Sequence, residues 1–378
     1  MTAGFMSVAT SKPDNGDRAL DKGVLVPMAS PPQIVLSTLN ARFIHASLGL
    51  RYLKANLDRH GRRGLEDLCV LREYTIKLAS EEIAEDLIQP FGPAPFGQKQ
   101  IVGFGVYIWN VAQTGSGIRL LKQRRPELIV VVGGPEVSHE LAGQAIVALA
   151  DYVITGWGDV SFAKLCRALI DGPQPIMRVW AGEQPPMDDI ELPYQQFSDD
   201  DLRHRVLYVE ASRGCPFKCS FCLSALDKTA WAFGIDRFLV ALDALYERGA
   251  RQFKFVDRTF NLKIDQSTRI LKFFLDKLSQ QPPNEQSSDL ALHFEVVPDH
   301  LPDRLKALLV QFPQGVLQFE LGIQTLNRDV QEVVSRKQDN MLALANIAWL
   351  KSNTRAHLHV DLIFGLRSEE HTSELQSP

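Results

Sequence analysis

Short apolar runs alternate with segments of helical spacing along most of this 378-residue chain, and this alternation limits its fold more than any other feature. Between residues 33 and 170 the pair repeats five times, from "QIVLSTL" to "DYVITGWGD" and the helix after it. Strands that are apolar throughout are typical of a parallel sheet covered by helices on both faces. Residues 32–170 are therefore predicted to form a doubly wound, Rossmann-like α/β domain.

A second series of the same kind follows a proline-rich, acidic segment. That segment, residues 171–203, is expected to be a linker. From residue 204 five more apolar runs alternate with helical segments, ending in "RAHLHVDLIFGL" at residues 355–366. This repetition predicts a (β/α) barrel of the TIM type over residues 204–366, with its site at the carboxyl ends of the strands. Such barrels have about eight strands, so this one is expected to be incomplete.

The two ends of the chain do not continue these patterns. Residues 1–31 lack the basic start and apolar block of a signal peptide and are expected to be a disordered tail. Residues 367–378, "RSEEHTSELQSP", resemble the translated read-through of a sequencing adapter. We therefore expect this tail to be non-native and the barrel to be truncated; the alternative is a genuine polar tail.

Composition and charge argue against several classes of partner. The net charge is −4 at pH 7, so no broad basic surface predicts nucleic-acid binding. No apolar run approaches the roughly 20 residues of a membrane helix. Of the five cysteines, Cys69 and Cys166 are isolated, which is typical of proteins in a reducing compartment. We expect a cytoplasmic protein with neither a nucleic-acid nor a membrane partner.

The other three cysteines lie close together in "SRGCPFKCSFCLS", directly after the first strand of the predicted barrel. Cys215, Cys219 and Cys222 have the spacing Cys-x3-Cys-x2-Cys. Thiolates are the usual ligands of iron–sulfur clusters, and three can hold three irons of a four-iron cluster while the fourth stays open. Zinc is the alternative, but it requires a fourth ligand, and the nearest histidine, His204, lies at the far end of the strand.

The segment "CPFKCSFC" resembles the signature of the radical S-adenosylmethionine (radical SAM) superfamily, in which an aromatic residue, here Phe221, precedes the last cysteine. The resemblance implies that Cys215, Cys219 and Cys222 bind a 4Fe–4S cluster whose open iron holds the amino and carboxylate groups of S-adenosylmethionine. It implies that reductive cleavage of S-adenosylmethionine gives a 5′-deoxyadenosyl radical, with a reductant such as flavodoxin or ferredoxin as partner. It also places Phe221 near the adenine.

Polar residues at other strand ends are further candidates for S-adenosylmethionine binding. Glu320 and Gln324 share one face of "ELGIQT" by strand alternation. The family often has a Gly-Gly-Glu element after the second strand, which holds the amino group. This chain has "VDRTFN" there, and Asp257 is the candidate replacement, with Thr259 or Asn261 as alternatives. The competing interpretation is a layer of polar residues that satisfy one another.

The whole span 33–366 resembles the radical SAM subclass with an N-terminal cobalamin-binding domain, and more narrowly an uncharacterised bacterial subgroup of it. The resemblance rests on "LNARFIHASLGLRYLKANL", "VVVGGPEVS" and "DYVITGWGD". Glycine-rich strand ends let a flat corrin approach the backbone closely. The expected cobalamin contacts are Tyr107, Gly133, Gly134, Gly156, Trp157 and Gly158.

No protein ligand to cobalt is assigned. "DRHGRRG", at residues 58–64, is similar to the Asp-x-His-x-x-Gly element of histidine-ligated cobalamin domains, but its spacing differs by one and it follows a helix. His45 is better placed, although its spacing does not match either. Methylthiotransferases also place an α/β domain before this barrel, but they carry three cysteines there, and this chain has only two.

The resemblance implies a radical SAM enzyme with a 4Fe–4S cluster and cobalamin that methylates an unactivated carbon of a small molecule or peptide, although no residue by itself encodes methyl transfer. One alternative is another radical SAM reaction, such as a rearrangement, with or without cobalamin. Another is a non-enzymatic, corrinoid-binding sensor that contains zinc or a cluster. No motif identifies the substrate, the catalytic residues or the oligomeric state.

Overall fold

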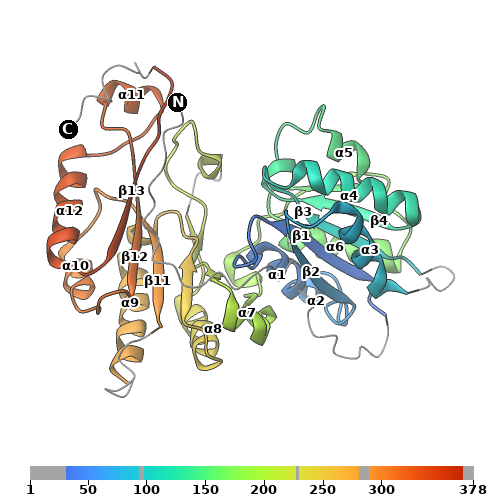
Figure 1. Ribbon diagram of the computed structural model, residues 1–378, viewed down its shortest axis with the longest axis horizontal. Helices are drawn as coiled ribbons and strands as arrows, with labels where there is room; N and C mark the ends of the chain where they lie inside the picture. The colour runs from blue at the N-terminus through green and yellow to red at the C-terminus, as the bar shows by residue number, and fades with distance from the viewer. Residues whose placement is uncertain (1–30, 93–97, 227–229, 281–288, 369–378) are drawn as a thin grey trace. The chain divides into compact units, whose positions relative to one another are not determined.

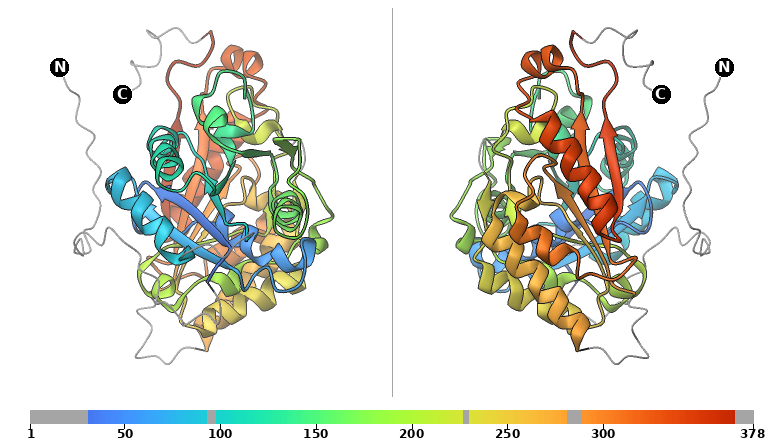
Figure 2. Two further views of the ribbon diagram at one scale, coloured as in Figure 1. Left: turned by 90° about the vertical axis from the view of Figure 1, so that its right-hand side faces the viewer. Right: turned by 90° about the vertical axis from the view of Figure 1, so that its left-hand side faces the viewer.

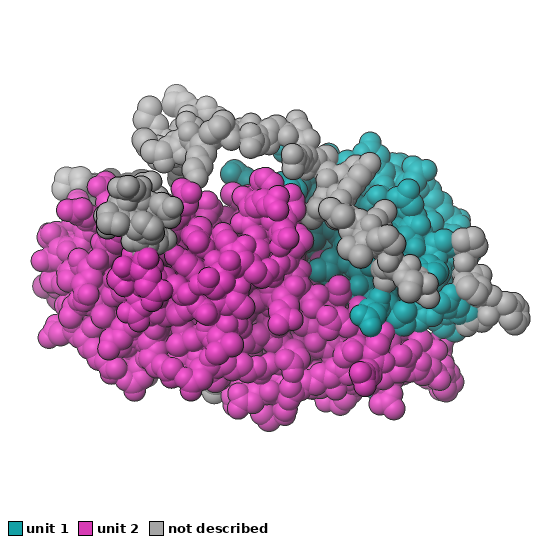
Figure 3. Space-filling view, turned by 90° about the horizontal axis from the view of Figure 1, so that it is seen from below, with its two compact units in different colours: residues 1–43, 67–155, 177–179 teal, residues 44–66, 156–176, 180–378 magenta. Residues whose placement is uncertain are grey.

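The computed structural model describes residues 31–92, 98–226, 230–280 and 289–368. The chain divides into two compact units, coloured separately in Figure 3: residues 1–43, 67–155 and 177–179, and residues 44–66, 156–176 and 180–378. The expectations for the tails, residues 1–31 and 367–378, fall almost entirely outside the described residues.

The first unit is built on a parallel sheet with the order β2-β1-β3-β4-β5-β6. Its strands are β1 (Ile34–Asn40), β2 (Cys69–Thr75), β3 (Ile101–Gly105), β4 (Ile129–Gly133), β5 (Tyr152–Thr155) and β6 (Val179–Ala181), of which only Val179 belongs to the first unit. The strand order reverses between β1 and β3, and open α/β sheets bind ligands at the carboxyl ends of the strands beside such a reversal. The doubly wound sheet is confirmed.

The central strands β1, β3 and β4 are buried along nearly their whole length because apolar residues occupy both of their faces, whereas the edge strand β6 is largely exposed. In the first unit α3 (Ser80–Ile88), α4 (Val111–Arg124) and the short α5 (Ala145–Leu149) pack with it, and Figure 1 shows α3 and α4 lying along the strands. Leu87 and Ile118 from these helices join Val102 and Val130 from the strands in one buried cluster. A ligand therefore reaches this sheet at its strand ends.

The segment 171–203, expected to be a linker, is well structured. After β6 it contains three short helices: η3 (Met187–Asp189), η4 (Tyr194–Gln196) and α7 (Asp199–His204). Ile190, Tyr194 and Phe197 are buried. These three residues have the i, i+4, i+7 spacing of a helix face, but Pro185, Pro186 and Pro193 interrupt a continuous helix, so the sequence favours a linker there.

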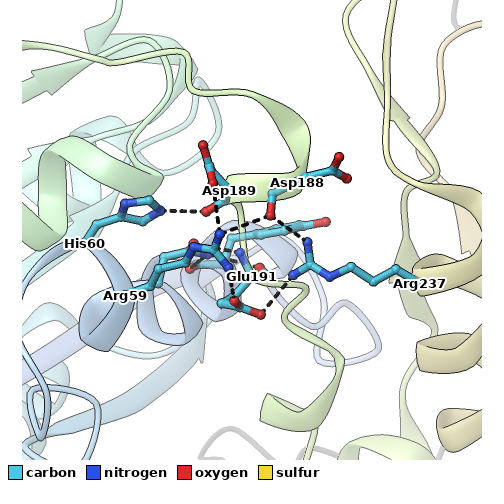
Figure 4. Close-up of polar contacts among 8 residues, drawn as sticks. Arg59, His60, Asp188, Asp189, Glu191 and Arg237 are labelled. Atoms are coloured by element: carbon cyan, nitrogen blue, oxygen red, sulfur yellow. Dashed lines mark hydrogen bonds and ion pairs between the residues drawn. The ribbon is translucent and has the colours of Figure 1, made fainter.

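Polar contacts fasten the same segment within the second unit (Figure 4). Arg59 of α2 (Leu57–His60) pairs with Asp189, at 2.9 Å, and with Glu191. Arg237 of α8 (Ile235–Glu247) reaches the other oxygen of Glu191 at 2.9 Å. The acidic residues of the segment thus connect α2 to α8, although each exposed pair contributes little stability by itself.

The second unit contains a parallel sheet with the order β13-β12-β11-β10-β7, which follows the chain as the wall of a barrel does. Its strands are β7 (Leu207–Val209), β10 (Gln252–Phe255), β11 (Ala291–Val296), β12 (Leu317–Gln324) and β13 (His357–Leu362). All five predicted barrel strands are present. The unit also includes α1 (Leu48–Ala55), α2 and α6 (Asp159–Asp171), which follow strands of the first sheet in the chain.

One face of this second sheet is apolar and the other is polar. Alternate residues such as Phe253, Phe294 and Phe319 are buried in a cluster with α8, α9 (Ile264–Ser279) and α10 (Asp303–Leu309). Figure 2 shows these helices and α12 (Asn340–Asn353) along one face of the sheet. The strand residues that alternate with these phenylalanines, including Lys254 and Glu320, point to the other face of the sheet and are only half-buried. This open polar face is the one expected of a barrel interior that holds a polar ligand.

Candidate cofactor site

The cysteine loop leaves β7 and is framed by a short antiparallel pair, β8 (Ser212–Arg213) and β9 (Trp231–Ala232). Gly214 has a φ of +85°, a conformation that side chains disfavour, and it turns the chain into Cys215. All three cysteines of the loop are free: Cys215 is half-buried, Cys219 buried and Cys222 exposed. The pKa of the Cys215 thiol is raised by burial, and the neighbouring thiols Cys222 and Cys219 add to that rise.

The middle of this loop is held by the segment that follows α11 (Arg328–Val333). The backbone amide of Ser220 donates to the Val334 carbonyl at 2.9 Å. The Arg336 guanidinium lies 3.9 Å from the Cys219 sulfur and also donates to the Gly322 carbonyl. No sequence pattern pointed to Arg336, because it lies more than a hundred residues from the cysteines in a segment without a motif. It places a positive charge beside a thiol that must ionise to bind iron.

The donor set fits an iron–sulfur cluster in its chemistry. Three free thiols on one loop, with a cation beside one of them, match the ligands of such clusters. Among the described residues, no three His, Cys, Asp or Glu side chains are gathered closely enough to hold a single metal ion.

Asp257, the predicted contact for the S-adenosylmethionine amino group, is buried under the start of the loop. Its carboxylate accepts from the Ala211 amide at 2.9 Å and from the Ser212 hydroxyl at 2.6 Å. Burial raises its pKa to about 7 despite these hydrogen bonds. Both oxygens are therefore occupied in fixing the two residues that lead from β7 into the cysteine loop.

Glu320 lies at the centre of the polar face of the second sheet. Its Oε1 lies 2.8 Å from His293 Nε2 and 3.1 Å from Lys254 Nζ. The polar contact with His293, together with Lys254, lowers the pKa of Glu320 to about 2. The adjacent pair, Arg258 and Glu295, is joined at 3.0 Å. The structure thus brings Glu320 into a charged network on three neighbouring strands.

Gln324 and Phe221 complete the residues predicted to contact S-adenosylmethionine. Gln324 ends β12 with a φ of +69°, and its side chain folds back over Gly322, where a Cβ would collide with the Gln324 amide. Gly322 therefore makes room for this side chain. Phe221 is exposed on the cysteine loop.

Three of the predicted cobalamin contacts belong to the first unit. Tyr107 stacks on Trp109 with ring centroids 4.5 Å apart, and Trp109 donates to the Leu39 carbonyl at 3.2 Å. The pair lies beyond β3, at the reversal of strand order. Gly134 has a φ of +115°, and a Cβ there would lie 2.6 Å from the Val106 carbonyl oxygen. Gly133 is less confined, since a Cβ would lie 3.5 Å from its nearest neighbour.

The other three belong to the second unit, in the loop before α6. Gly156 has a φ of +68° and open space where a Cβ would lie. Trp157 packs against the buried cluster of Tyr52, Ile190 and Phe233, while a Cβ at Gly158 would lie 2.9 Å from Leu53. Trp157 thus has a structural role in the second unit.

The histidines weighed as cobalt ligands contact protein groups. His60 Nε2 lies 2.8 Å from the Asp189 carbonyl oxygen, as Figure 4 shows. Asp58 accepts from the Gly64 and Glu66 amides, as expected of a helix end. His45 Nδ1 lies 2.7 Å from the Tyr208 hydroxyl.

In the described part of the chain, no helix has the length and apolar character needed to cross a membrane.

Comparison with protein families identifies both halves of the chain. Residues 34–166 match the B12 binding domain, and residues 209–374 match the radical SAM superfamily. The chain joins a B12-binding domain to a radical SAM domain. Radical SAM domains use a 4Fe–4S cluster and S-adenosylmethionine, and the B12-binding domain adds cobalamin, as predicted. The radical SAM match extends into residues 367–374, part of the segment expected to be non-native.

Distant relatives with named activities support this assignment. The chain is 28% identical over 259 residues to an uncharacterized methyltransferase of Pyrococcus horikoshii, covering 61% of this chain and 53% of the relative. It is 24% identical to the cobalamin-dependent radical SAM methyltransferase TokK of Streptomyces tokunonensis, over 38% of this chain and 23% of TokK. The chain thus spans about half or less of these relatives.

The fold is that of solved cobalamin-dependent radical SAM proteins. The radical SAM methyltransferase TsrM of Kitasatospora setae, with tryptophan and a SAM analog bound, superposes with a TM-score of 0.65 at 15% identity, covering 89% of this chain and 68% of TsrM. The cobalamin-dependent radical enzyme OxsB gives a TM-score of 0.61 at 14% identity, covering 89% of this chain and 49% of OxsB. At these identities the likeness concerns the fold.

Proposed function

We propose that this protein is a cobalamin-dependent radical SAM methyltransferase that acts on an unactivated carbon of a small molecule or peptide. The observation that carries the proposal is the set of three free cysteines on the loop after β7, at the carboxyl end of a parallel sheet. The relatives whose names state a methyltransferase activity support methyl transfer.

The residues of the second unit would position the cofactors and keep the loop in place. Cys215, Cys219 and Cys222 would supply the thiolates, and Arg336 would offset part of their negative charge. Asp257 fixes the base of the loop through Ala211 and Ser212. When bound, the cluster supplies the electron that cleaves S-adenosylmethionine.

The polar face of the second sheet would receive S-adenosylmethionine. Glu320, held ionised by His293 and Lys254, would accept hydrogen bonds from hydroxyl or amino groups. Gln324 at the end of β12 would offer an amide, and Phe221 an aromatic surface. The glycines and aromatics at the ends of β3, β4 and β5 would contact cobalamin. A flavodoxin or ferredoxin would deliver the electron, in the cytoplasm.

Anaerobic reconstitution with iron and sulfide tests the proposal. The wild-type chain should bind about four irons, as expected for one 4Fe–4S cluster. Cys219→Ala should lose most of this iron, whereas Cys69→Ala, a matched control for a buried cysteine outside the loop, should retain it. Binding of one zinc and no iron by the wild type would contradict the proposal.

Two further measurements address the remaining parts. Hydroxocobalamin should stay with the protein on gel filtration, with a shifted absorption spectrum. The reduced, reconstituted protein should convert S-adenosylmethionine to 5′-deoxyadenosine, and Cys219→Ala should not. A protein that binds the cluster but releases all added cobalamin would exclude the cobalamin-dependent reaction.

A further inference from the structure

One buried arginine joins two loops that the sequence assigns to different cofactors. Arg213 lies directly before Gly214 and Cys215, at the start of the cysteine loop. Its guanidinium donates to both carboxylate oxygens of Asp159, at 2.7 and 3.2 Å. Asp159 is the first residue of α6 and directly follows Gly156–Gly158, where cobalamin contacts are predicted. All of these residues belong to the second unit.

The surroundings of Arg213 leave its side chain little freedom. Its Nε donates to Glu210 at 2.6 Å, and only 14% of the side chain is exposed. The guanidinium lies 4.2 Å from the centroid of the Tyr52 ring and 5.1 Å from that of Trp157. The planar guanidinium can donate hydrogen bonds to two carboxylates while its face stacks on aromatic rings. A lysine ammonium cannot make this combination of contacts.

Arg213 contacts the loop at residues 156–158 through two neighbouring residues, Trp157 and Asp159. Trp157 is itself one of the predicted cobalamin contacts, so Arg213 touches that loop through a ring as well as through Asp159. Removing one partner of a buried ion pair leaves the other charge uncompensated. The two loops therefore cannot shift independently without exposing or stranding a charge.

We propose that Arg213 and Asp159 form a positioning pair that couples the order of the cluster loop to the order of the loop at residues 156–158. The inference rests on the proposed function, because it assumes that the first loop binds the cluster and the second contacts cobalamin. Binding of either cofactor should then strengthen binding of the other, since coupling between two sites is reciprocal.

The coupling is measured by titrating hydroxocobalamin, followed by absorption, into the full 378-residue chain with and without reconstituted cluster. In the wild type we expect the cluster to tighten cobalamin binding by at least about fivefold, the lower end of usual coupling between sites. Asp159→Asn and Arg213→Lys should bring this ratio close to one, because each weakens the paired charges while preserving most of the volume.

Lys164→Gln is the matched control. Lys164 lies on the same helix as Asp159, α6, and the substitution removes only its exposed ion pair with Glu183. It should keep the wild-type ratio. A second readout requires no cofactor: amide hydrogen exchange in Asp159→Asn should accelerate both at residues 156–160 and at residues 212–216. Acceleration confined to the first segment would contradict coupling.

The outcomes separate the two proposals. Equal cobalamin affinity with and without the cluster in the wild type would overturn the coupling and leave the proposed function intact. The same conclusion follows if Asp159→Asn retains the wild-type ratio. A wild-type protein that binds no cobalamin at all would overturn the proposed function and this inference with it.

Discussion

The two parallel sheets of this protein bury their strands in different ways. In the first sheet consecutive residues of β4, such as Val130 and Val131, are both buried. In the second sheet burial alternates, so that Phe294 is buried while Glu295 beside it is only half-buried. Both sheets come from the same kind of βα repeat.

The difference shows where each sheet can bind a ligand. The first has apolar residues on both faces and offers a ligand its glycine-rich and aromatic strand ends. The second has a polar face that carries a network of charges around Glu320, in addition to the cysteine loop at its end. The strand ends of the first sheet suit a flat ring such as the corrin of cobalamin. The polar face of the second sheet suits a charged nucleoside such as S-adenosylmethionine.

The largest effect should come from the apolar face of the second sheet. Phe294 packs against Phe255 and Phe260 with ring centroids 4.6 and 4.1 Å apart. Phe294→Ala should lower the free energy of unfolding by about 3–5 kcal/mol, from lost burial and a cavity. Glu295→Ala, the neighbouring control, should change it by less than about 1 kcal/mol because its partner Arg258 is exposed. Urea denaturation measures both; equal losses would contradict one-sided burial.

The buried carboxyl under the cysteine loop should make stability depend on pH. The pKa of Asp257 is about 7 in the folded chain, well above the value near 4 of an unfolded aspartate. The unfolded chain therefore loses its proton first, and stability should fall as pH rises from about 4 to 7, by a few kcal/mol at most.

Asp257→Asn keeps the shape and removes the titration, so its unfolding free energy relative to wild type should rise over that interval. Denaturation midpoints at several pH values, measured without cofactors, provide the test. A difference between the two proteins that stays constant from pH 4 to 7 would show that Asp257 is ionised throughout.

The glycines at the strand ends should differ between the units. Gly134→Ala should cost about 2–3 kcal/mol, because it combines a positive φ with a close approach to the Val106 carbonyl. Gly156→Ala should cost only about 1 kcal/mol, since its φ is positive but the surrounding space is open. Thermal unfolding of the two variants distinguishes them, and equal costs would mean that the close approach at Gly134 is relieved by movement.

The smallest effect should come from the ionised Glu320. Its pKa of about 2 lies below that of an unfolded glutamate, so its contribution is present above about pH 4.3 and is lost as pH falls toward 2. With nearly a third of the side chain exposed, solvent screening should limit this to about 1 kcal/mol. Glu320→Gln should flatten that part of the acid unfolding curve; an unchanged curve would indicate that His293 and Lys254 do not stabilise its charge.

Sequence patterns predicted the features that depend on short-range periodicity. Both sheets, most of their helices and the position of the cysteine loop follow from apolar repeats and cysteine spacing. The patterns missed β6, α5 and the folded course of residues 171–203, because these elements are only three to six residues long and prolines interrupt the last segment. The residues that hold the cysteine loop were also missed. Arg336 and Asp159 reach it from distant segments, and no periodicity records such contacts.

The central claim is that the loop of Cys215, Cys219 and Cys222 holds a 4Fe–4S cluster with one iron left open for S-adenosylmethionine. Electron paramagnetic resonance of the reduced, reconstituted protein tests this directly. The account predicts a cluster signal whose line shape changes when S-adenosylmethionine is added, and loss of that signal in Cys219→Ala. A full complement of iron with a spectrum indifferent to S-adenosylmethionine would contradict it.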